Sequence, residues 1–441
     1  MARTAANIPA GMRVADHITL GVLTTQFPRE LVEQVLFETE RVSERERDLP
    51  AHVMVYFAIA LALYPDVATR EVLRCLVEGA RWLGDPARPR IPTKSGISQA
   101  RSRLGATPLE ALYRAVVAPV AIEGTPGAWY RGWRVMSLDG TTLDVSDTPE
   151  NAEAFGRPGS GRGVNATGAF PQLRLVALVE NGTHALCAAQ LGDYHTHEIK
   201  LAAAGVLPAL TGEMLCLADR GFLGFDLFQQ ASATGAALVW RAKASQRLPV
   251  LEAYPDGSYR SEVRWNSHCR SLNRTPIPVR VVAYTLPDTA EADVVYRLVT
   301  NILDPARAPA VDLARLYHER WEIETAFNEF KTHLRGGQRV LRSKTPALVQ
   351  QEAWGFLLAH FALRALMHEA ALGALPRARD PDTLSFVHVV RVTRRTLAHL
   401  AAIPPSGPTA VARRTPARTA GRDGERQSRS PRATRRQAQD E

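Results

Sequence analysis

The chain has 441 residues, of which 45% are apolar and 22% are charged, and its formal net charge is +9. This length allows two or three domains with buried cores, and the composition is that of a globular protein. Together with four dispersed cysteines and the shortness of the apolar runs, these values exclude a disordered chain, a disulfide-rich secreted scaffold and an integral membrane protein.

The positive charge is concentrated at the C-terminal end. Residues 404–441 contain nine arginines and four acids, a net +5, so the rest of the chain carries only +4. This tail has five prolines and no aromatic residue, and we expect it to be disordered. It would add salt-sensitive attraction to DNA, or it is a solubilising tail. The isolated cysteines predict reduced thiols and a cytoplasmic protein.

Residues 1–125 are predicted to form an all-helical N-terminal domain that binds DNA. Apolar positions recur three and four residues apart from residue 17 to about residue 120. Within this region, Thr93–Leu104 begins with a capping residue and carries Lys94 and Arg101. This segment is either a helix that enters a DNA groove or a capped surface helix with solvated charges.

Residues 126–245 and 306–375 are predicted to form a mixed α/β core. Asp139 and Asp219 each follow an apolar strand, a costly place for an acid unless it is exposed or binds something positive. The expected elements are a strand at 133–139, a hairpin at 170–180 and 184–191, a strand at 214–219, a helix at 225–234 and a strand at 236–243. The last strand carries Arg241 and Lys243 on one face, where they either follow phosphates or are solvated.

The core is interrupted and followed by smaller segments. Residues 246–305 are rich in β-forming residues and turns and are predicted to be a β insertion. Helical periodicity returns at 310–334, and residues 376–403 are predicted to contain a C-terminal helix. The glycine-rich loop 156–163 lacks the lysine of a phosphate-binding loop. With Arg162 it is either a basic loop that touches DNA or a plain connector.

One helix places four functional side chains along a single stripe. At about 100° per residue, Tyr317, Arg320, Glu324 and Lys331 fall within an arc of about 60°, beside the apolar stripe of the same helix. The alternative is an ordinary charge ladder on a solvated helix. If Glu324 meets Asp139 and Asp219, the three carboxylates suit hard divalent cations such as Mg²⁺.

At these residues the sequence resembles the insertion-element-four family of bacterial DDE transposases. Tyr317, Arg320, Glu324 and Lys331 reproduce its Y-(2)-R-(3)-E-(6)-K signature. Asp139-Gly140-Thr141 is similar to the family's first aspartate motif, and Asp219-Arg220-Gly221-Phe222 to its second. The two aspartates lie 80 residues apart, and the glutamate follows 105 residues later, after the β insertion.

The resemblance implies a ribonuclease-H-like mixed-sheet core in an α/β fold. It implies that Asp139, Asp219 and Glu324 are catalytic and hold two Mg²⁺ ions, for which Mn²⁺ can substitute. Tyr317, Arg320 and Lys331 would contact DNA near the cut. An aromatic residue could hold a flipped base, and Trp265 and Trp240 are both candidates. The alternative for either tryptophan, and the one that we favour, is a packed core residue.

The implied function is transposition of an insertion sequence. The protein would bind terminal inverted repeats in double-stranded DNA, cut at the element ends and join the 3′-OH ends to target DNA, acting as a dimer on DNA. Two alternatives stay open: an inert protein that only binds the repeats, and a ribonuclease-H-like nuclease that cuts without joining.

Overall fold

The computed structural model of the chain describes residues 20–43, 49–80, 91–158, 169–265, 274–285, 295–336, 340–373 and 380–395. None of the helices in these ranges has the length and apolar character needed to cross a membrane.

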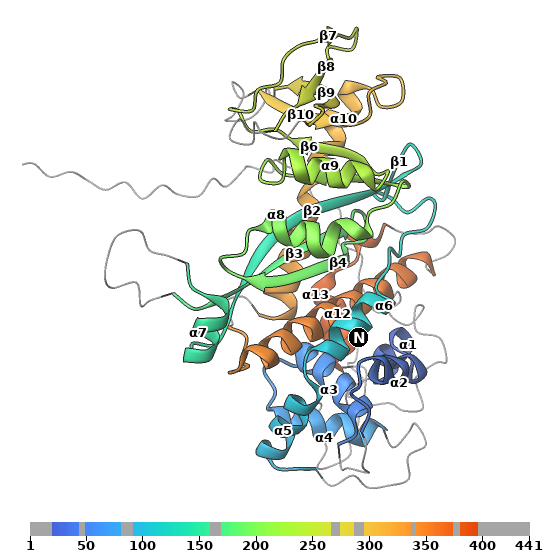
Figure 1. Cartoon of the computed structure of the whole chain (residues 1–441). Helices are drawn as coiled ribbons and strands as arrows, with labels where there is room; N and C mark the ends of the chain where they lie inside the picture. Colours follow the sequence, from blue (N-terminus) through green and yellow to red (C-terminus); the bar gives the residue numbers. More distant parts are fainter. Residues whose placement is uncertain are drawn as a thin grey trace, which may run out of the picture.

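Helices occupy the N-terminal part of the described chain, at the lower end of the molecule in Figure 1. They are α1 (Leu20–Gln26), α2 (Arg29–Glu38), α3 (Ala51–Leu63), α4 (Thr69–Ala80), α5 (Lys94–Leu104) and α6 (Thr107–Val116). Helix α3 has no polar face, since all residues from Met54 to Leu63 are buried. A helix of this kind is stable only when other elements surround it.

A ten-stranded sheet runs through the described residues in the order β4-β3-β2-β5-β6-β10-β9-β8-β7, with β1 paired to β2. Its first part consists of β1 (Trp129–Tyr130), β2 (Trp133–Asp144), β3 (Gln172–Glu180), β4 (Ala185–Asp193), β5 (Met214–Ala218) and β6 (Ala237–Arg241). Strands β2, β5 and β6 are parallel, and β3 and β4 are antiparallel to their neighbours. This mixed parallel and antiparallel sheet, preceded by helices, confirms the predicted α/β fold class.

The strands of the predicted β insertion extend the same sheet. They are β7 (Glu252–Ala253), β8 (Tyr259–Val263), β9 (Ile277–Tyr284) and β10 (Tyr296–Thr300). Strand β10 pairs antiparallel with β6, so the insertion lies at the edge of the core beyond β6 (Figure 1). Strand β6 ends at Arg241, two residues earlier than predicted, which places Lys243 in the loop that follows.

Helices pack on both faces of the central strands. Helix α7 (Pro149–Phe155) packs Phe155 on the face that α12 covers. The opposite face carries α8 (Glu198–Leu201), a π-helix at 202–206 and a 3₁₀ turn at 207–209. Helix α9 (Phe225–Ala233) packs Phe228 against Trp240 of β6 on that side. On the other face, α10 (Ala310–His318) packs Leu313 and Leu316 into a cluster with Val239 and Leu298.

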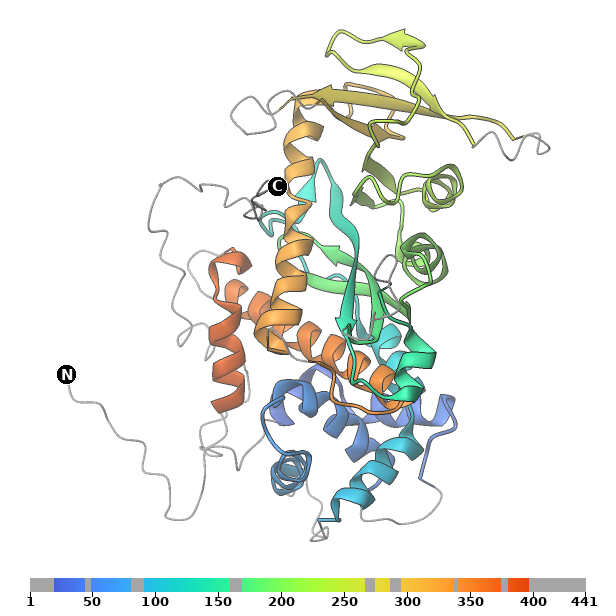
Figure 2. The same ribbon diagram turned by 90° about the vertical axis from the view of Figure 1, so that its left-hand side faces the viewer.

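The predicted helix at 310–334 is a column of three pieces. Helix α10 is followed by α11 (Trp321–Asn328) and by a π-helix at Glu329–Leu334 (η6), and the column runs alongside the sheet (Figure 2). A π-helix has wider turns than an α-helix, so it rotates the residues that follow it. The expectation of one uniform helical stripe is therefore wrong in detail, and Lys331 lies on the π segment.

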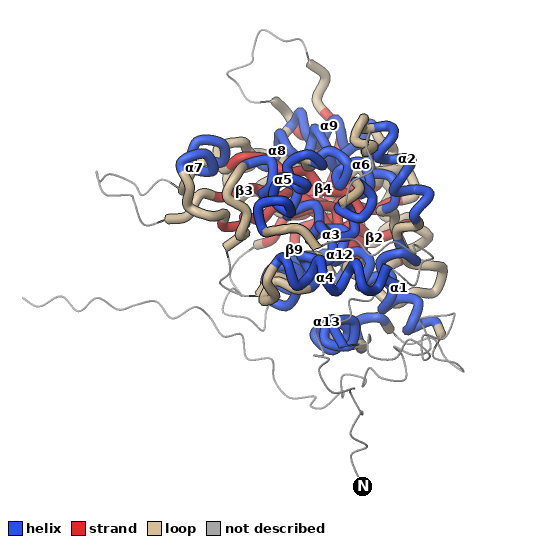
Figure 3. The backbone as a smooth tube through the Cα atoms, turned by 90° about the horizontal axis from the view of Figure 1, so that it is seen from below, coloured by secondary structure: helices blue, strands red, loops and turns tan. Residues whose placement is uncertain are grey.

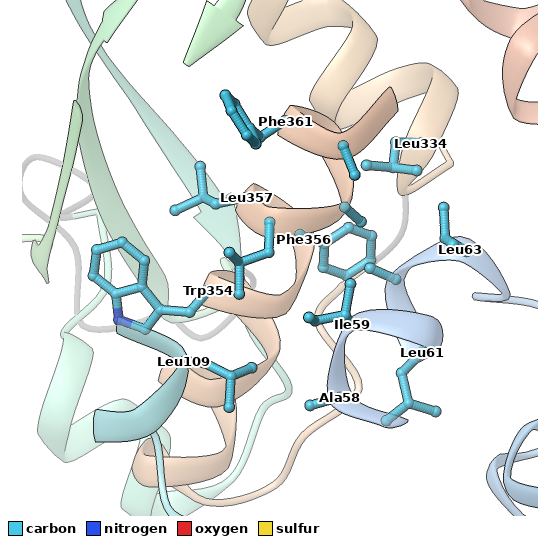
Figure 4. Packing of buried hydrophobic residues seen from close by; sticks show 14 of the residues in the cluster. Ala58, Ile59, Leu61, Leu63, Leu109, Leu334, Trp354, Phe356, Leu357 and Phe361 are labelled. Atoms are coloured by element: carbon cyan, nitrogen blue, oxygen red, sulfur yellow. The ribbon is translucent and has the colours of Figure 1, made fainter. Parts of the chain in front are cut away.

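The long helix α12 (Pro346–Leu372) joins the N-terminal helices to the core. It packs against α3, α6 and β4, and seen from below α3, α4, α5 and α12 lie across the strands (Figure 3). Side chains such as Trp354, Phe356, Ile59 and Leu109 belong to one continuous apolar cluster (Figure 4). The predicted domain 1–125 therefore shares its core with α12 and with β3 and β4.

The described chain ends with a short 3₁₀ helix, η7 (Pro381–Thr383), and with α13 (Phe386–Arg395). Both fall inside the segment 376–403 that was predicted to contain a C-terminal helix. The basic tail 404–441 lies outside the described residues.

Gly355 allows α12 to approach α3 closely, and its replacement tests this contact. A Cβ at Gly355 would lie 2.7 Å from the backbone oxygen of Ala58, which cannot move aside easily. Gly355→Ala gains about 0.5–1 kcal/mol in helix propensity, but overpacking costs about 1–3 kcal/mol. We expect a lower thermal unfolding midpoint, measured by calorimetry. Gly212→Ala is the control, because its Cβ would meet backbone only at 3.7 Å; an unchanged midpoint for Gly355→Ala would contradict the prediction.

Candidate active site

The sheet register brings the two aspartates to the same level on neighbouring strands. Leu138 of β2 is paired with Ala218, the last residue of β5, so Asp139 and Asp219 both follow a paired position. Strand β2 was predicted to end at Asp139, but it continues to Asp144 and stays paired with β3. Asp139 is accessible on the β5 side because β5 stops first.

The Asp139 carboxylate is held by two donors. Its Oδ1 accepts from the Gly140 N–H at 2.8 Å, and its Oδ2 accepts from Arg320 Nη1 at 3.3 Å. The pKa of Asp139 is raised to about 6, mainly by burial. The hydrogen bond from Gly140 and the charge of Arg320 oppose this rise, and the charges of Asp219 and Glu198 add to it. A carboxylate in this position gains from additional positive charge.

Arg320 joins Asp139 to Glu324. Its Nη2 donates to Glu324 Oε1 at 3.0 Å while its Nη1 contacts Asp139, and the arginine side chain is only 12% exposed. One guanidinium thus connects a strand of the sheet to helix α11. Since Asp219 is placed beside Asp139 by the register, the structure gathers the three predicted carboxylates in one region.

Tyr317 and Lys331 extend this arrangement in both directions along the sheet. The buried Tyr317 hydroxyl donates to the Ala218 oxygen at 3.3 Å, immediately before Asp219. Lys331 Nζ contacts Thr141 Oγ1 at 3.0 Å, two residues after Asp139. The Tyr317 ring is buried in the structure, and its hydroxyl holds the end of β5. The expected contact of Tyr317 with DNA stays a prediction.

The other predicted DNA contacts have different environments. Lys94 is exposed at the start of α5, and Lys243 is exposed beyond β6. Arg241 is half-buried, with its guanidinium 4.3 Å from the centre of the Tyr296 ring. Arg162 lies outside the described residues.

Arg101 is a correction to the predicted DNA-binding set. Its side chain is buried, and its Nε donates to Gln351 Oε1 at 2.8 Å. Its Nη2 donates to Ser343 at 3.1 Å. These bonds hold α5 to α12, so the charge is used inside the protein and does not face a DNA backbone.

The two tryptophans that are candidates for holding a flipped base, Trp240 and Trp265, differ in how deeply they are buried. Trp240 is fully buried and packs edge-on against Phe228, so it is a core residue. Trp265 is partly buried and packs on Phe225 with ring centres 5.8 Å apart. Only Trp265 retains exposed surface.

Sequence reasoning missed two side chains at this site. The side chain of Glu198, the first residue of α8, lies against Gly140. A Cβ added at Gly140 would be only 2.5 Å from the carboxyl carbon of Glu198. Trp321 is 61% exposed, with the Arg320 guanidinium 5.8 Å from its ring centre. Trp321 follows the signature arginine directly, which was the signal available; no local pattern linked Glu198 to Asp139.

The carboxylate oxygens of Asp139, Asp219 and Glu324 are the donors that a hard divalent cation prefers. In the structure, Arg320 provides the positive charge for two of them. Among the described residues, ligand atoms within 4.8 Å of one another are found in a different group, formed by His184, Glu322 and Asp382.

Comparison with known proteins agrees with this geometry. A family model described as the insertion element 4 transposase N-terminal region matches residues 17–114, and a transposase DDE domain model matches residues 131–362. The chain is similar to "Transposase InsG for insertion sequence element IS4" of Escherichia coli (strain K12), with 29% identity over 370 residues, 83% of this chain and 80% of that protein.

Among solved structures, the chain is similar to the piggyBac transposase synaptic complex with hairpin DNA, at 10% sequence identity and a TM-score of 0.44, over 86% of this chain and 80% of that chain. The DDE domain match alone spans more than half of the sequence and contains Asp139, Asp219 and Glu324. The chain therefore belongs to the insertion element 4 family of DDE transposases, and it is a transposase enzyme.

Proposed function

We propose that this transposase binds the terminal inverted repeats of its own element, cleaves DNA at the element ends and transfers the 3′-OH ends to target DNA. The observation that supports this most directly is the bridge from Asp139 through Arg320 to Glu324, beside Asp219. Clustered carboxylates with an arginine between them suit the handling of a phosphodiester.

Asp139, Asp219 and Glu324 would together hold two Mg²⁺ ions, or Mn²⁺ in their place. Such ions supply charge that activates a nucleophile and stabilises a leaving oxygen. The protein's own contribution is positioning. Burial of Asp139 and its bond to Gly140 fix one carboxylate, and α11 fixes Glu324.

Arg320 would change partners when cations bind the carboxylates. It neutralises Asp139 and Glu324 in the structure, and a guanidinium freed from them has the fork geometry to grip two phosphate oxygens. Lys331, held against Thr141 further along β2, would neutralise a neighbouring phosphate. Tyr317 would act indirectly, by holding the strand end that leads to Asp219.

Further DNA contacts are proposed for Lys94, Lys243, Arg241 and Arg162, with the basic tail adding non-specific attraction. Two element ends must be brought together before joining, so we propose a dimer on DNA. The proposed setting is the bacterial cytoplasm, with the protein associated with the nucleoid.

Two other functions give different results in simple assays. An inert repeat-binding protein would shift DNA fragments carrying the inverted repeats without cutting them in Mg²⁺ or Mn²⁺. A nuclease that only cuts would give no joined product when supplied with precleaved ends and target DNA.

Neutralising each carboxylate tests the catalytic assignment. We expect Asp139→Asn, Asp219→Asn and Glu324→Gln each to reduce cleavage of repeat-containing DNA by about 10²-fold or more, because a ligand charge is lost. Binding, measured by gel shift, should stay close to that of the unaltered protein. Asp226→Asn, an exposed acid paired with Arg274, is the control. Full Mg²⁺-dependent cleavage in all three variants would refute the assignment.

Replacing Arg320 tests its role at the phosphate. Arg320→Ala should lower the single-turnover cleavage rate by roughly 10²–10³-fold, the loss typical of one charged donor to a transition state. Arg320→Lys should recover only part of this loss, since an ammonium cannot bind in bidentate fashion. Rates are measured at saturating enzyme, so that binding differences do not contribute. Equal rates for Arg320→Lys and the unaltered enzyme would argue against a bidentate role.

Tyr317→Phe separates strand positioning from DNA contact. Loss of the hydroxyl leaves the Ala218 oxygen without this donor and should reduce stability by about 0.5–1.5 kcal/mol. Thermal unfolding measures this effect, while affinity for repeat DNA should be unchanged. Tyr194→Phe, which keeps the ring that faces Arg174, is the matched control. A weakened DNA affinity without loss of stability would show that Tyr317 contacts DNA after all.

A further inference from the structure

A second cluster of potential metal ligands lies on the other side of α11 from the catalytic glutamate. Glu322 and Glu324 are two residues apart, so their side chains leave the helix in nearly opposite directions. Glu322 lies close to His184, in the turn between β3 and β4, and to Asp382 of η7. Three segments distant in sequence thus meet at one point.

His184 is the central residue of this cluster. It is only 4% exposed, and its Nε2 lies 3.3 Å from Asp382 Oδ1 and 3.8 Å from Glu322 Oε2. Within the part of the chain that the structure describes, neither His184 Nε2 nor Asp382 Oδ1 forms a hydrogen bond. A buried imidazole nitrogen without a hydrogen-bond partner, directed at two carboxylates, is unusual and calls for an explanation.

We propose that His184, Glu322 and Asp382 bind one Zn²⁺ ion, at a site separate from the catalytic carboxylates.

The spacing of the three groups suits this ion. In tetrahedral zinc sites with bonds of about 2.0–2.2 Å, ligand atoms lie about 3.3–3.6 Å apart. The two contacts of His184 Nε2 are close to this range, and all three ligand atoms lie within 4.8 Å of one another. An imidazole with carboxylates favours zinc over Mg²⁺, which prefers oxygen ligands alone.

The surrounding residues would hold the ligands in place. His184 Nδ1 lies 3.6 Å from Glu329 Oε1. With Nε2 bound to the ion, the imidazole hydrogen would be on Nδ1 and directed at this carboxylate, an arrangement that commonly orients a zinc ligand. Glu329 is itself fixed by the buried Arg364, whose Nε donates to it at 2.9 Å. The Gly182 N–H donates to Glu322 Oε2 and fixes the orientation of that carboxylate.

The site has a route for entry and for a fourth ligand. A cavity of about 570 Å³ is lined by His184, Glu322 and Asp382 and also by His318 and His333. A water molecule or one of the two additional histidines could complete a tetrahedral set from this side.

The balance of charge favours a cation here. In the described part of the chain, Arg364 is the one permanent positive charge that contacts this cluster, whose carboxylates are those of Glu322, Asp382 and Glu329. The competing explanation is a proton: Arg364 also contacts His184 Nδ1, and a hydrogen on Nε2 would then face the two carboxylates. Zinc binding distinguishes the two explanations, because a protonated Nε2 offers no lone pair to a metal.

Such an ion would connect three segments: the turn between β3 and β4 through His184, η7 through Asp382, and α11 through Glu322. The other side of α11 carries Glu324, so the metal would stabilise the helix that positions a catalytic group. Its role would be structural, and it takes no part in the proposed DNA chemistry.

The test is a zinc titration of the full chain after metal removal with a chelator. The titration is done without DNA and in excess Mg²⁺, which occupies the catalytic carboxylates. We expect one equivalent of Zn²⁺ to be taken from a chromophoric chelator, and Co²⁺ to give the visible absorption of a tetrahedral site. Zn²⁺ should also raise the thermal unfolding midpoint.

Two ligand variants and two controls decide the outcome. Asp382→Asn and His184→Gln should weaken zinc binding by more than about 100-fold. Replacing a residue that only supports a ligand typically lowers metal affinity by roughly 10–100-fold, so a larger loss indicates that a ligand itself was removed. Asp382 is partly exposed, so its variant remains informative if His184→Gln does not fold. Asp139→Asn and Asp226→Asn should keep the zinc. No zinc uptake by the unaltered protein, or a loss caused by Asp139→Asn instead, would overturn the proposal, whatever the catalytic variants do to cleavage.

Discussion

The contact of one guanidinium with two carboxylates from different elements is central to the structure of this transposase. Asp139 comes from a strand and Glu324 from a helix, and their negative charges repel each other unless a cation lies between them. Arg320 provides that cation from the same helical column as Glu324. In the mechanism that we propose, metal ions and phosphate would take over the contacts that the arginine makes.

The fold keeps these groups in place through two rigid connections. The parallel register of β2 and β5 sets the level of the two aspartates, and Tyr317 holds the end of β5 to the column. The column continues through the π-helix η6, and the long helix α12 then packs among the N-terminal helices. Because α12 shares one apolar cluster with the N-terminal helices and the sheet, DNA bound by those helices would keep a fixed relation to the catalytic carboxylates.

The proposed zinc site gives the column a second support. Glu322 faces the buried network of His184, Glu329 and Arg364, while Glu324, two residues later, faces Asp139. Helix α11 thus has ionic contacts on two sides, and we propose that only the side that carries Glu324 takes part in catalysis. The helical arrangement explains why two glutamates so close in sequence would have unrelated roles.

Much of this could be predicted from the sequence, because spacing determines which side chains share a helical face and alternation identifies a strand. Asp139, Asp219 and the signature helix were predicted in this way. Burial decided roles that the sequence pattern left open: Arg101 forms bonds inside the protein, and Trp240 is the core residue that its alternative interpretation described. A sequence pattern shows which residues are charged or aromatic, but it does not show which of them other elements cover.

The sequence by itself determined the identity and order of the proposed catalytic residues, through their resemblance to the family motifs, and local periodicity placed Tyr317, Arg320, Glu324 and Lys331 on one side of a helix. The tertiary structure alone decided that Arg320 joins two of the carboxylates, that Glu198 lies beside Gly140, and that His184 meets Glu322 and Asp382. Each of these contacts joins segments far apart in the chain. Their distances follow from strand register and helix packing, which no local pattern of residues records.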